Sequence, residues 1–387
     1  MGGSERMLEP GQYSEWRRRI VRWGMRPLFR ATSLRPGPTG RLSDGNIHRI
    51  LICRPNHRLG NLLLLTPLVT EIQRLFPDAD IDIVLAGEHV AELFRAFPNV
   101  KHIYNLSRRM VRHPVALART MLQLRQAHYD LAIDPCETSQ SGRLLVGVAK
   151  PEHALGPPRD RSAEQPDPTW MQHAPAHMAQ WPVHMLRMAT QPASPLREYP
   201  PLDIRLSTDE RQRGRAVLDR MLHAKGKQPG TVVGVFAEAT GAKVYGSDWW
   251  RRFIRTLQAE HPGAAIVEIA PPDGRPRLAM DLPSFSSPSP REVAAVIANM
   301  TCFVSADCGV MHLASASGAP TIGLFSVTEV SKYAPYGRGS RAIDTNGKSP
   351  EDVARIMGGL TGLFAVADAP AVREAPSATP DPDSPAR

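Results

Sequence analysis

The sequence predicts an α/β protein made of two doubly wound, parallel-sheet domains of the Rossmann type. A chain of 387 residues is too long for one ordinary hydrophobic core. Short apolar runs alternate with amphipathic helical stretches along most of its length, as βαβ units do. The apolar runs are bounded by Gly and Pro, which favours buried strands over helices. We therefore expect domains at 47–200 and 201–364, a segment with its linker at 1–46, and a disordered tail at 365–387.

The composition limits the partners and the cellular compartment expected for the protein. The net charge is +9, from 47 Lys and Arg against 38 Asp and Glu. This balance suits a polyanionic partner, such as nucleic acid, an acidic membrane or a phosphorylated glycolipid, although a genome-wide bias toward Arg codons gives the same charge. No apolar run approaches the ~20 residues that span a bilayer, and no signal-peptide pattern opens the chain. The cysteines, Cys53, Cys136, Cys302 and Cys308, form no CxxC pair, so we expect reduced thiols in a cytoplasmic protein.

The N-terminal segment is basic and amphipathic. Residues 16–30 read WRRRIVRWGMRPLFR, with six arginines among aromatic and aliphatic side chains. Such a segment suits the headgroup region of an anionic membrane, and Gly24 and Pro27 limit it to a surface association. A helix that docks on the globular body is an equal alternative. Nucleic-acid binding is disfavoured because no fold known for it follows.

The first domain is expected to begin at Ile47. Its predicted strands are 47–54, 81–85, 100–104 and 131–134, and its predicted helices are 62–76, 90–97 and 115–127. The stretch 150–200 differs, because it is rich in Pro, His and Met and breaks any long element. His173 and His177 have the spacing of a metal pair on a helix, but without a third ligand we expect no metal there. We interpret this stretch as a short helical insert that closes over a cleft or contacts a substrate.

The second domain repeats the alternation. Its predicted strands are 232–236, 265–269, 302–305 and 321–325, and its predicted helices are 208–224, 249–260, 291–299, 310–317 and a segment within 350–364.

The stretch from Met300 to Phe325 organises the second domain. Its turn, Asp307-Cys308-Gly309, follows a buried strand and opens a helix. Open α/β sheets bind ligands at that edge, and the free N–H groups of a helix start favour a phosphate. A plain strand–turn–helix unit is the alternative, and a lone histidine such as His312 is more often structural than functional.

The full string of residues is more specific than the turn. It resembles the signature of family 9 glycosyltransferases, the bacterial heptosyltransferases of lipopolysaccharide core assembly and their relatives. The matching residues are Asp307, Gly309, His312, Leu313, Ala314, Gly318, Pro320 and Phe325. Residues 58–68, RLGNLLLLTPL, and 76–84, FPDADIDIV, resemble the start of the same family. Cys308 replaces the usual Ser or Thr, and Ser326 replaces a usual Gly.

The resemblance covers about 47–345 and implies the GT-B arrangement, two Rossmann-like domains that face each other across a cleft. The first domain would hold the acceptor and the second the nucleotide-sugar donor. The implied reaction is an inverting, metal-independent sugar transfer, with ADP-heptose favoured as the donor and a lipopolysaccharide-core or similar lipid-linked saccharide as the acceptor. No cofactor is implied. The implied location is the cytoplasm, or the inner face of the inner membrane as a peripheral protein.

The resemblance also assigns the donor site. Thr240 and Lys243 match a turn that would meet the diphosphate. Asp307 would hold the sugar or order its turn, and Gly309 would let the backbone approach the phosphates. The backbone N–H groups offered at the helix start are those of Val310, Met311 and His312.

The catalytic base is the main departure from the family. Asn61 stands where the heptosyltransferases commonly carry a catalytic Asp, and an amide is no proton acceptor near neutral pH. His57 is the nearest titratable candidate, with Asp134 and Glu137 as alternatives on the same sheet edge. Two other functions follow from these departures and from the basic N-terminus. One is a non-catalytic homologue that binds nucleotide-sugar or glycolipid, and the other is a membrane-surface scaffold.

Overall fold

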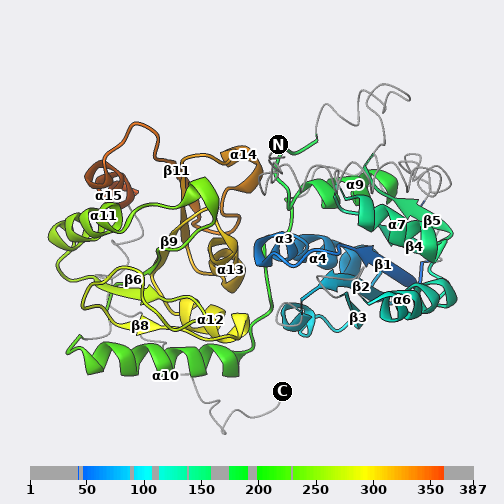
Figure 1. Cartoon of the computed structure of the whole chain (residues 1–387), viewed down its shortest axis with the longest axis horizontal. Helices are drawn as coiled ribbons and strands as arrows, with labels where there is room; N and C mark the ends of the chain where they lie inside the picture. Colours follow the sequence, from blue (N-terminus) through cyan, green and yellow to red (C-terminus); the bar gives the residue numbers. More distant parts are fainter. Residues whose placement is uncertain are drawn as a thin grey trace, which may run out of the picture.

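The computed structural model has two α/β domains side by side, each with one parallel sheet (Figure 1), so the predicted fold class is confirmed. The segment 16–30, the tail 365–387, Glu137 and His173 lie outside the described residues. The structure describes residues 42, 47–87, 91–106, 113–136, 139–157, 174–190, 198–227 and 230–360.

The first sheet has the strand order β3-β2-β1-β4-β5, all parallel. Its strands are β1 (Arg49–Cys53), β2 (Asp80–Ala86), β3 (Val100–Leu106), β4 (Leu131–Ile133) and β5 (His153–Leu155). Its helices are α3 (Leu59–Leu63), α4 (Thr66–Leu75), the 3-10 turn η1 (Glu92–Phe94), α6 (Pro114–Gln126), α7 (Gln140–Ala149) and α9 (Trp181–Thr190).

Alternation along β1 shows how helices cover both faces of this sheet. Ile50 and Ile52 pack into the core shared with α3, α4 and α9. Leu51 and Cys53 point the other way, into the core shared with α6 and α7. Since successive side chains of a strand face opposite sides, a strand segment buried on both faces is apolar, as β1 is from Ile50 to Cys53.

The second sheet has the order β11-β10-β9-β6-β7-β8, again parallel. Its strands are β6 (Val232–Phe236), β7 (Ala265–Ile269), β8 (Ser284–Phe285), β9 (Cys302–Ala306), β10 (Thr321–Phe325) and β11 (Arg341–Asp344). Its helices are α10 (Thr208–Ala224), η3 (Gly241–Lys243), α11 (Ser247–Glu260), α12 (Pro290–Ile297), α13 (Gly309–Ser317), α14 (Val330–Tyr333) and α15 (Pro350–Gly359).

Two predicted helices of the first domain are wrong in detail. The expected helix 62–76 is divided into α3 and α4 because Pro67, in the first turn of α4, has no N–H to continue the ladder. The Thr66 hydroxyl donates to the Leu63 carbonyl instead, at 2.8 Å. Within the expected helix 90–97, Ala91 is helical and is followed by the 3-10 turn η1, and the chain leaves the helical conformation after it. The strands β5, β8 and β11 were not predicted, because edge strands this short carry little apolar signal.

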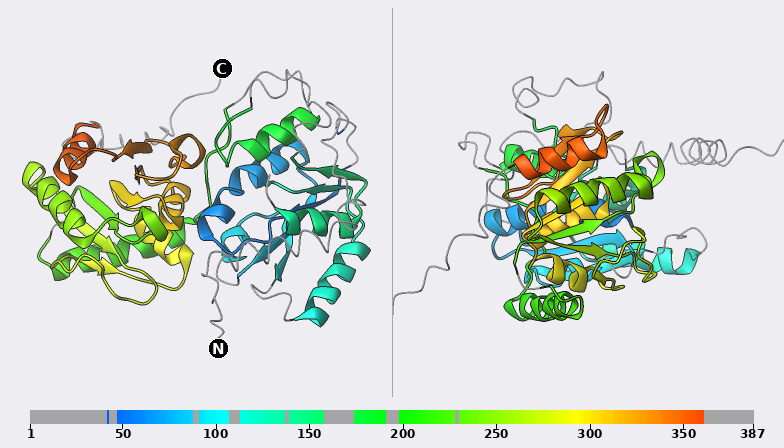
Figure 2. Two further views of the ribbon diagram at one scale, coloured as in Figure 1. Left: turned by 45° about the horizontal axis from the view of Figure 1, so that its top comes forward. Right: turned by 90° about the vertical axis from the view of Figure 1, so that its left-hand side faces the viewer.

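The domains meet where α3 packs against α13, which lie side by side in Figure 1 and in the left view of Figure 2. The largest cluster of buried apolar side chains runs without a break from Ile50 in the first domain to Phe303 in the second. The insert adds a second bridge, because the His177 ring lies 2.9 Å from the Ala334 carbonyl. Next to it, the Met178 amide donates to the Lys332 carbonyl at 3.1 Å.

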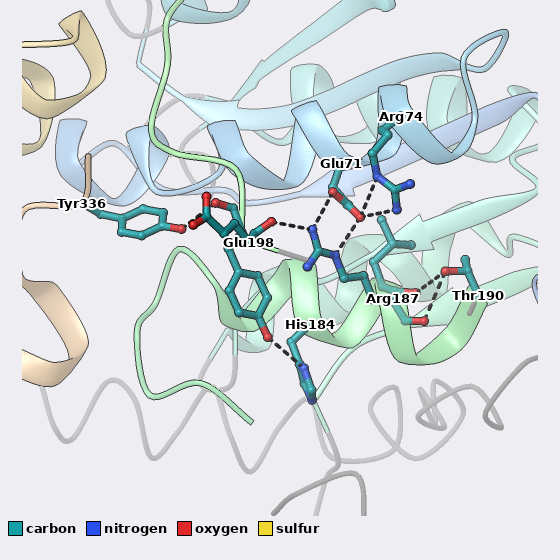
Figure 3. A network of polar contacts seen from close by, with 9 residues as sticks. Glu71, Arg74, His184, Arg187, Thr190, Glu198 and Tyr336 are labelled. Carbon is teal, nitrogen blue, oxygen red and sulfur yellow. Dashed lines mark hydrogen bonds and ion pairs between the residues drawn. The ribbon is translucent and has the colours of Figure 1, made fainter. Parts of the chain in front are cut away.

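A buried ionic network joins α4, α9 and the connector between the domains, residues 198–207 (Figure 3). Glu71 is 1% exposed and accepts hydrogen bonds from Arg187 at 2.8 Å and from Arg74 at 2.7 Å. Arg187 lies over the Tyr199 ring, 4.9 Å from its centroid. Tyr336, from the second domain, donates to the Tyr199 carbonyl at 2.8 Å. The network therefore ties the connector to both domains at once.

Candidate functional site

A cleft of about 720 Å³ opens between the two domains. The first domain lines it with residues 57–61, which follow β1. The second domain lines it with the turn after β6, with Pro271 and Pro272 after β7, and with the start of α13 after β9. All these segments leave the carboxyl ends of parallel strands, where open α/β sheets bind their ligands.

The structure brings nearly all the predicted site residues to this cleft. Its lining includes His57 and Asn61 from the first domain. From the second domain it includes Thr240, Lys243, Asp307, Gly309, Val310 and His312. Met311 is the exception, since its side chain is fully buried and only its backbone can serve the site.

Lys243 and Asp307 form the charged centre of the cleft. The Lys243 ammonium lies 3.0 Å from an Asp307 carboxylate oxygen. Lys243 ends the short turn η3, and Gly241 lets that turn form because its φ of 66° is one that side chains rarely adopt. The Asp307 side chain is only 7% exposed while that of Lys243 is 28% exposed. The ammonium is therefore held on a fixed carboxylate and still faces the cleft.

His312 lies on the other side of Asp307, with its Nε2 atom 3.8 Å from the second carboxylate oxygen. Burial lowers the pKa of His312 to about 4, against the opposing effect of the Asp307 charge, and the charges of His177 and Lys243 add to the lowering. The imidazole is therefore neutral near pH 7. Its buried Nδ1 atom has no hydrogen-bond partner within the described part of the chain. A neutral ring beside a lysine–aspartate pair can orient a polar ligand without adding charge.

The start of α13 differs from the prediction by one residue. The helix begins at Gly309 with Cys308 as its N-cap, so the amides left free by helix geometry are those of Gly309, Val310 and Met311. His312 is the fourth residue of the helix, where the ladder of backbone hydrogen bonds begins, and a donor role for its amide stays a prediction. The Cys308 side chain makes no capping hydrogen bond; its sulfur lies 3.3 Å from the Ser305 hydroxyl, and burial raises the pKa of this thiol. The amides at the helix start therefore suit an anionic oxygen.

Two glycines allow the domains to approach each other beside this helix start. A methyl group on Gly60 would lie 2.8 Å from the His312 ring, closer than real side chains come. A methyl group on Gly309 would lie 3.0 Å from Leu59 and 3.2 Å from the Gly60 nitrogen. In the structure Gly309 lies against α3, and its role in the approach of phosphates stays a prediction. The close contact between the domains therefore favours glycine at both positions.

The candidates for a catalytic base are placed differently by the fold. His57 is exposed and Asn61 half-buried, and both line the cleft. Asp134, at the end of β4, is fully buried and is not part of the cleft lining. One of its oxygens accepts the Cys136 amide at 3.2 Å, and the other lies 4.0 Å from the Arg143 guanidinium. Among the described candidates, only His57 combines a titratable group with access to the cleft.

The burial of Asp134 leads to a testable prediction about stability. Burial raises its pKa to about 7, although the Cys136 amide and the charges of Arg143 and Arg54 oppose this. A raised pKa favours folding below about pH 4, and this contribution is lost as the pH rises to about 7. We expect Asp134→Asn, which cannot ionise, to gain stability relative to the parent protein across this window, by up to about 1.4 kcal/mol per pH unit. Urea unfolding of both proteins at pH 5 and pH 7.5 measures it, and an equal difference at the two pH values would contradict it.

Two features are absent from the described ranges of the chain. There, no group of three or more His, Cys, Asp or Glu side chains is arranged to hold a metal ion. Over the same residues, no helix is both long enough and apolar enough to cross a bilayer.

Comparison with known proteins finds a family match within the second domain. Residues 287–355 match the sequence model of glycosyltransferase family 9 (heptosyltransferase). No curated protein matches the chain in sequence.

Solved structures match over both domains. The family 9 glycosyl transferase of Veillonella parvula DSM 2008 is 15% identical with a TM-score of 0.64, over 83% of this chain and 98% of that one. The E. coli ADP-heptose LPS heptosyltransferase II is 16% identical with a TM-score of 0.59, over 83% and 99%. The E. coli heptosyltransferase WaaC with ADP is 19% identical with a TM-score of 0.58, over 81% and 99%. The predicted resemblance is therefore confirmed: residues 287–355 have the sequence pattern of family 9 glycosyltransferases, and the fold of both domains is similar to that of these solved structures.

Proposed function

We propose that this protein transfers a sugar from a nucleotide donor to a hydroxyl group of a lipid-linked saccharide, with inversion at the anomeric carbon and without a metal ion. ADP-heptose is the favoured donor, and a lipopolysaccharide-core or similar glycolipid is the favoured acceptor. One observation carries the proposal. The Lys243–Asp307 pair and the start of α13 face residues 57–61 of the other domain across one cleft.

The donor-side groups fit a departing nucleoside diphosphate. Its charge grows as the bond to the sugar breaks, so positive groups and N–H donors at that point lower the barrier. Lys243 supplies a full positive charge, the Thr240 hydroxyl adds a donor, and the α13 amides add the positive end of the helix. A lysine and a helix start together perform the neutralisation that a divalent cation performs elsewhere, which supports a metal-independent reaction.

The acceptor side supplies the rest of the displacement. The acceptor hydroxyl attacks the anomeric carbon from the face opposite the diphosphate, and it loses its proton to a base as the sugar–phosphate bond breaks. His57 is the group we assign as that base, because it is a titratable side chain in the cleft lining of the first domain. Asn61 can orient the hydroxyl by hydrogen bonding but cannot take its proton.

The donor nucleotide is tested by thermal unfolding with ADP, UDP, GDP or CMP, each with and without EDTA. A ligand that binds only the folded state raises the melting temperature. We expect a rise with ADP that EDTA does not change. ADP is favoured because the WaaC structure similar to this fold is described with ADP. A shift with UDP or GDP alone would change the assigned donor, and a shift that EDTA abolishes would contradict metal independence.

A non-catalytic homologue is the second candidate, and the position of Asn61 favours it. This amide lines the cleft where the family commonly has its catalytic Asp. The two candidates differ in turnover and not in binding. Release of ADP from ADP-heptose in the presence of a lipopolysaccharide acceptor with a truncated core supports the catalytic function. Binding of ADP without release from any nucleotide-sugar supports the non-catalytic homologue.

The contact between α3 and α13 gives a prediction for the activity. Gly60→Ala places a methyl group against the His312 ring and pushes the two cleft walls apart. Since misplacement of reacting groups by 1 Å can cost ~100-fold, we expect at least a tenfold loss of kcat/KM. Gly263→Ala is the matched control, because its added methyl group meets no atom within 4 Å. Equal activity of the two variants would show that the cleft tolerates the wider spacing.

A further inference from the structure

Helix α6 has an unusual outer face. It lies on the flank of the first domain, away from the interdomain contact, and projects beyond the sheet in the left view of Figure 2. Its inner side packs on the sheet through Leu117 and Leu124. Its outer side carries Val115, 74% exposed, and Leu122, 56% exposed. These are two of the few large apolar side chains exposed on the described residues, and both are on one helix.

The exposed apolar residues follow helical spacing. Val115, Ala118 and Leu122 are three and four residues apart, so they form one stripe along the outer side. Arg119 and Arg125 are also exposed, and a helical projection places them on opposite sides of this stripe. An apolar stripe between cationic side chains is the pattern of a helix that lies in a membrane interface.

The charged side chains of α6 and of its flanking sequence are of one sign. The sequence has no Asp or Glu from Lys101 to Tyr129. Asp130 is the next acidic residue, and its carboxylate accepts hydrogen bonds from the backbone amides of His48 and Arg49, at 2.7 and 2.8 Å. No carboxylate of the helix itself therefore offsets Arg119 and Arg125, and the surface is complementary to an anionic one.

We infer that the outer face of α6 binds the surface of an anionic lipid bilayer. Val115 and Leu122 enter the headgroup region while Arg119 and Arg125 pair with lipid phosphates. The apolar surface consists of two large side chains on a helix about 20 Å long. This surface is too small for a stable protein interface, which needs ~1,000 Å² or more, but it suits a reversible contact with a membrane surface. The inference stands apart from the proposed reaction, since it requires no donor or acceptor.

The test is co-sedimentation of the full chain with vesicles. One set contains phosphatidylglycerol and phosphatidylcholine, and the other phosphatidylcholine alone. We expect binding to the anionic set that weakens as salt is raised. The variant Val115→Gln/Leu122→Gln and the variant Arg119→Gln/Arg125→Gln should each bind about tenfold less tightly or weaker, since each near-surface charge contributes about fivefold. Leu122→Trp should bind more tightly, because Trp favours the membrane interface.

Matched controls come from the second domain. Ile356→Gln removes an exposed apolar side chain from α15, and Arg255→Gln removes an exposed charge from α11. Both should bind vesicles as the parent protein does. Absence of binding to anionic vesicles, or a loss equal to that of the controls, would overturn the inference. The inference would also be wrong if the α6 variants still bound the vesicles and deletion of residues 1–40 abolished binding. That result would assign the contact to the basic segment 16–30.

Discussion

Lys243→Ala should reduce kcat by about 100-fold to 1,000-fold, the usual cost of removing one preorganised group that stabilises developing charge. The ammonium is held 3.0 Å from Asp307 in the cleft, where a diphosphate would gain charge as the donor bond breaks. The side chain is partly exposed, so its loss should leave the fold intact. The measurement is initial-rate kinetics with ADP-heptose, together with a thermal melt of the same sample.

Lys348→Ala is the matched control for this experiment. Lys348 is an exposed lysine of the same domain and is not part of the cleft lining. Its removal should change neither kcat nor the melting temperature. If Lys243→Ala kept the parent rate, Lys243 would not contact the leaving group and the assigned donor site would be wrong.

Glu71→Ala should lower the free energy of unfolding by about 3–5 kcal/mol, the usual cost of removing one partner of a buried ion pair. Burial raises the pKa of Glu71, but the hydrogen bonds and charges of Arg187 and Arg74 outweigh this, so the pKa lies below its ordinary value. Without the carboxylate, the Arg187 charge stays in an environment where its side chain is 15% exposed. Urea unfolding at pH 7 measures the change.

The control for Glu71 is an ion pair of the same geometry on the surface. Glu351 accepts two hydrogen bonds from Arg252, at 2.7 and 2.8 Å, but the Arg252 side chain is 58% exposed. Solvent screens such a pair, so Glu351→Ala should change stability far less than Glu71→Ala. Equal losses of stability in the two variants would show that burial does not determine how much the Glu71 ion pair contributes to stability.

Local patterns were sufficient for four elements of the second domain. Helix 208–224 and strands 232–236, 265–269 and 321–325 have the predicted bounds. Each strand is buried on both faces and bounded by breakers, and the helix starts at a Ser207–Glu210 capping box, so the sequence signal there is strong. The prediction failed where the signal was weak or ambiguous. Pro67 lies inside an apolar run that continues on both sides of it, and the run concealed the break between α3 and α4.

The sequence by itself determined the two-domain α/β class, the edge of the sheet at which Asp307, Gly309 and His312 lie, and the resemblance to family 9. These follow from the order of apolar and polar residues, which is local information. The tertiary structure decided which residues meet. It placed Lys243 on Asp307, paired Glu71 with Arg187, and brought Gly60 against His312. These contacts join segments 64, 116 and 252 positions apart along the chain. The first two form when each domain assembles around its own sheet, and the third forms only where the two domains meet, so none of them follows from local sequence.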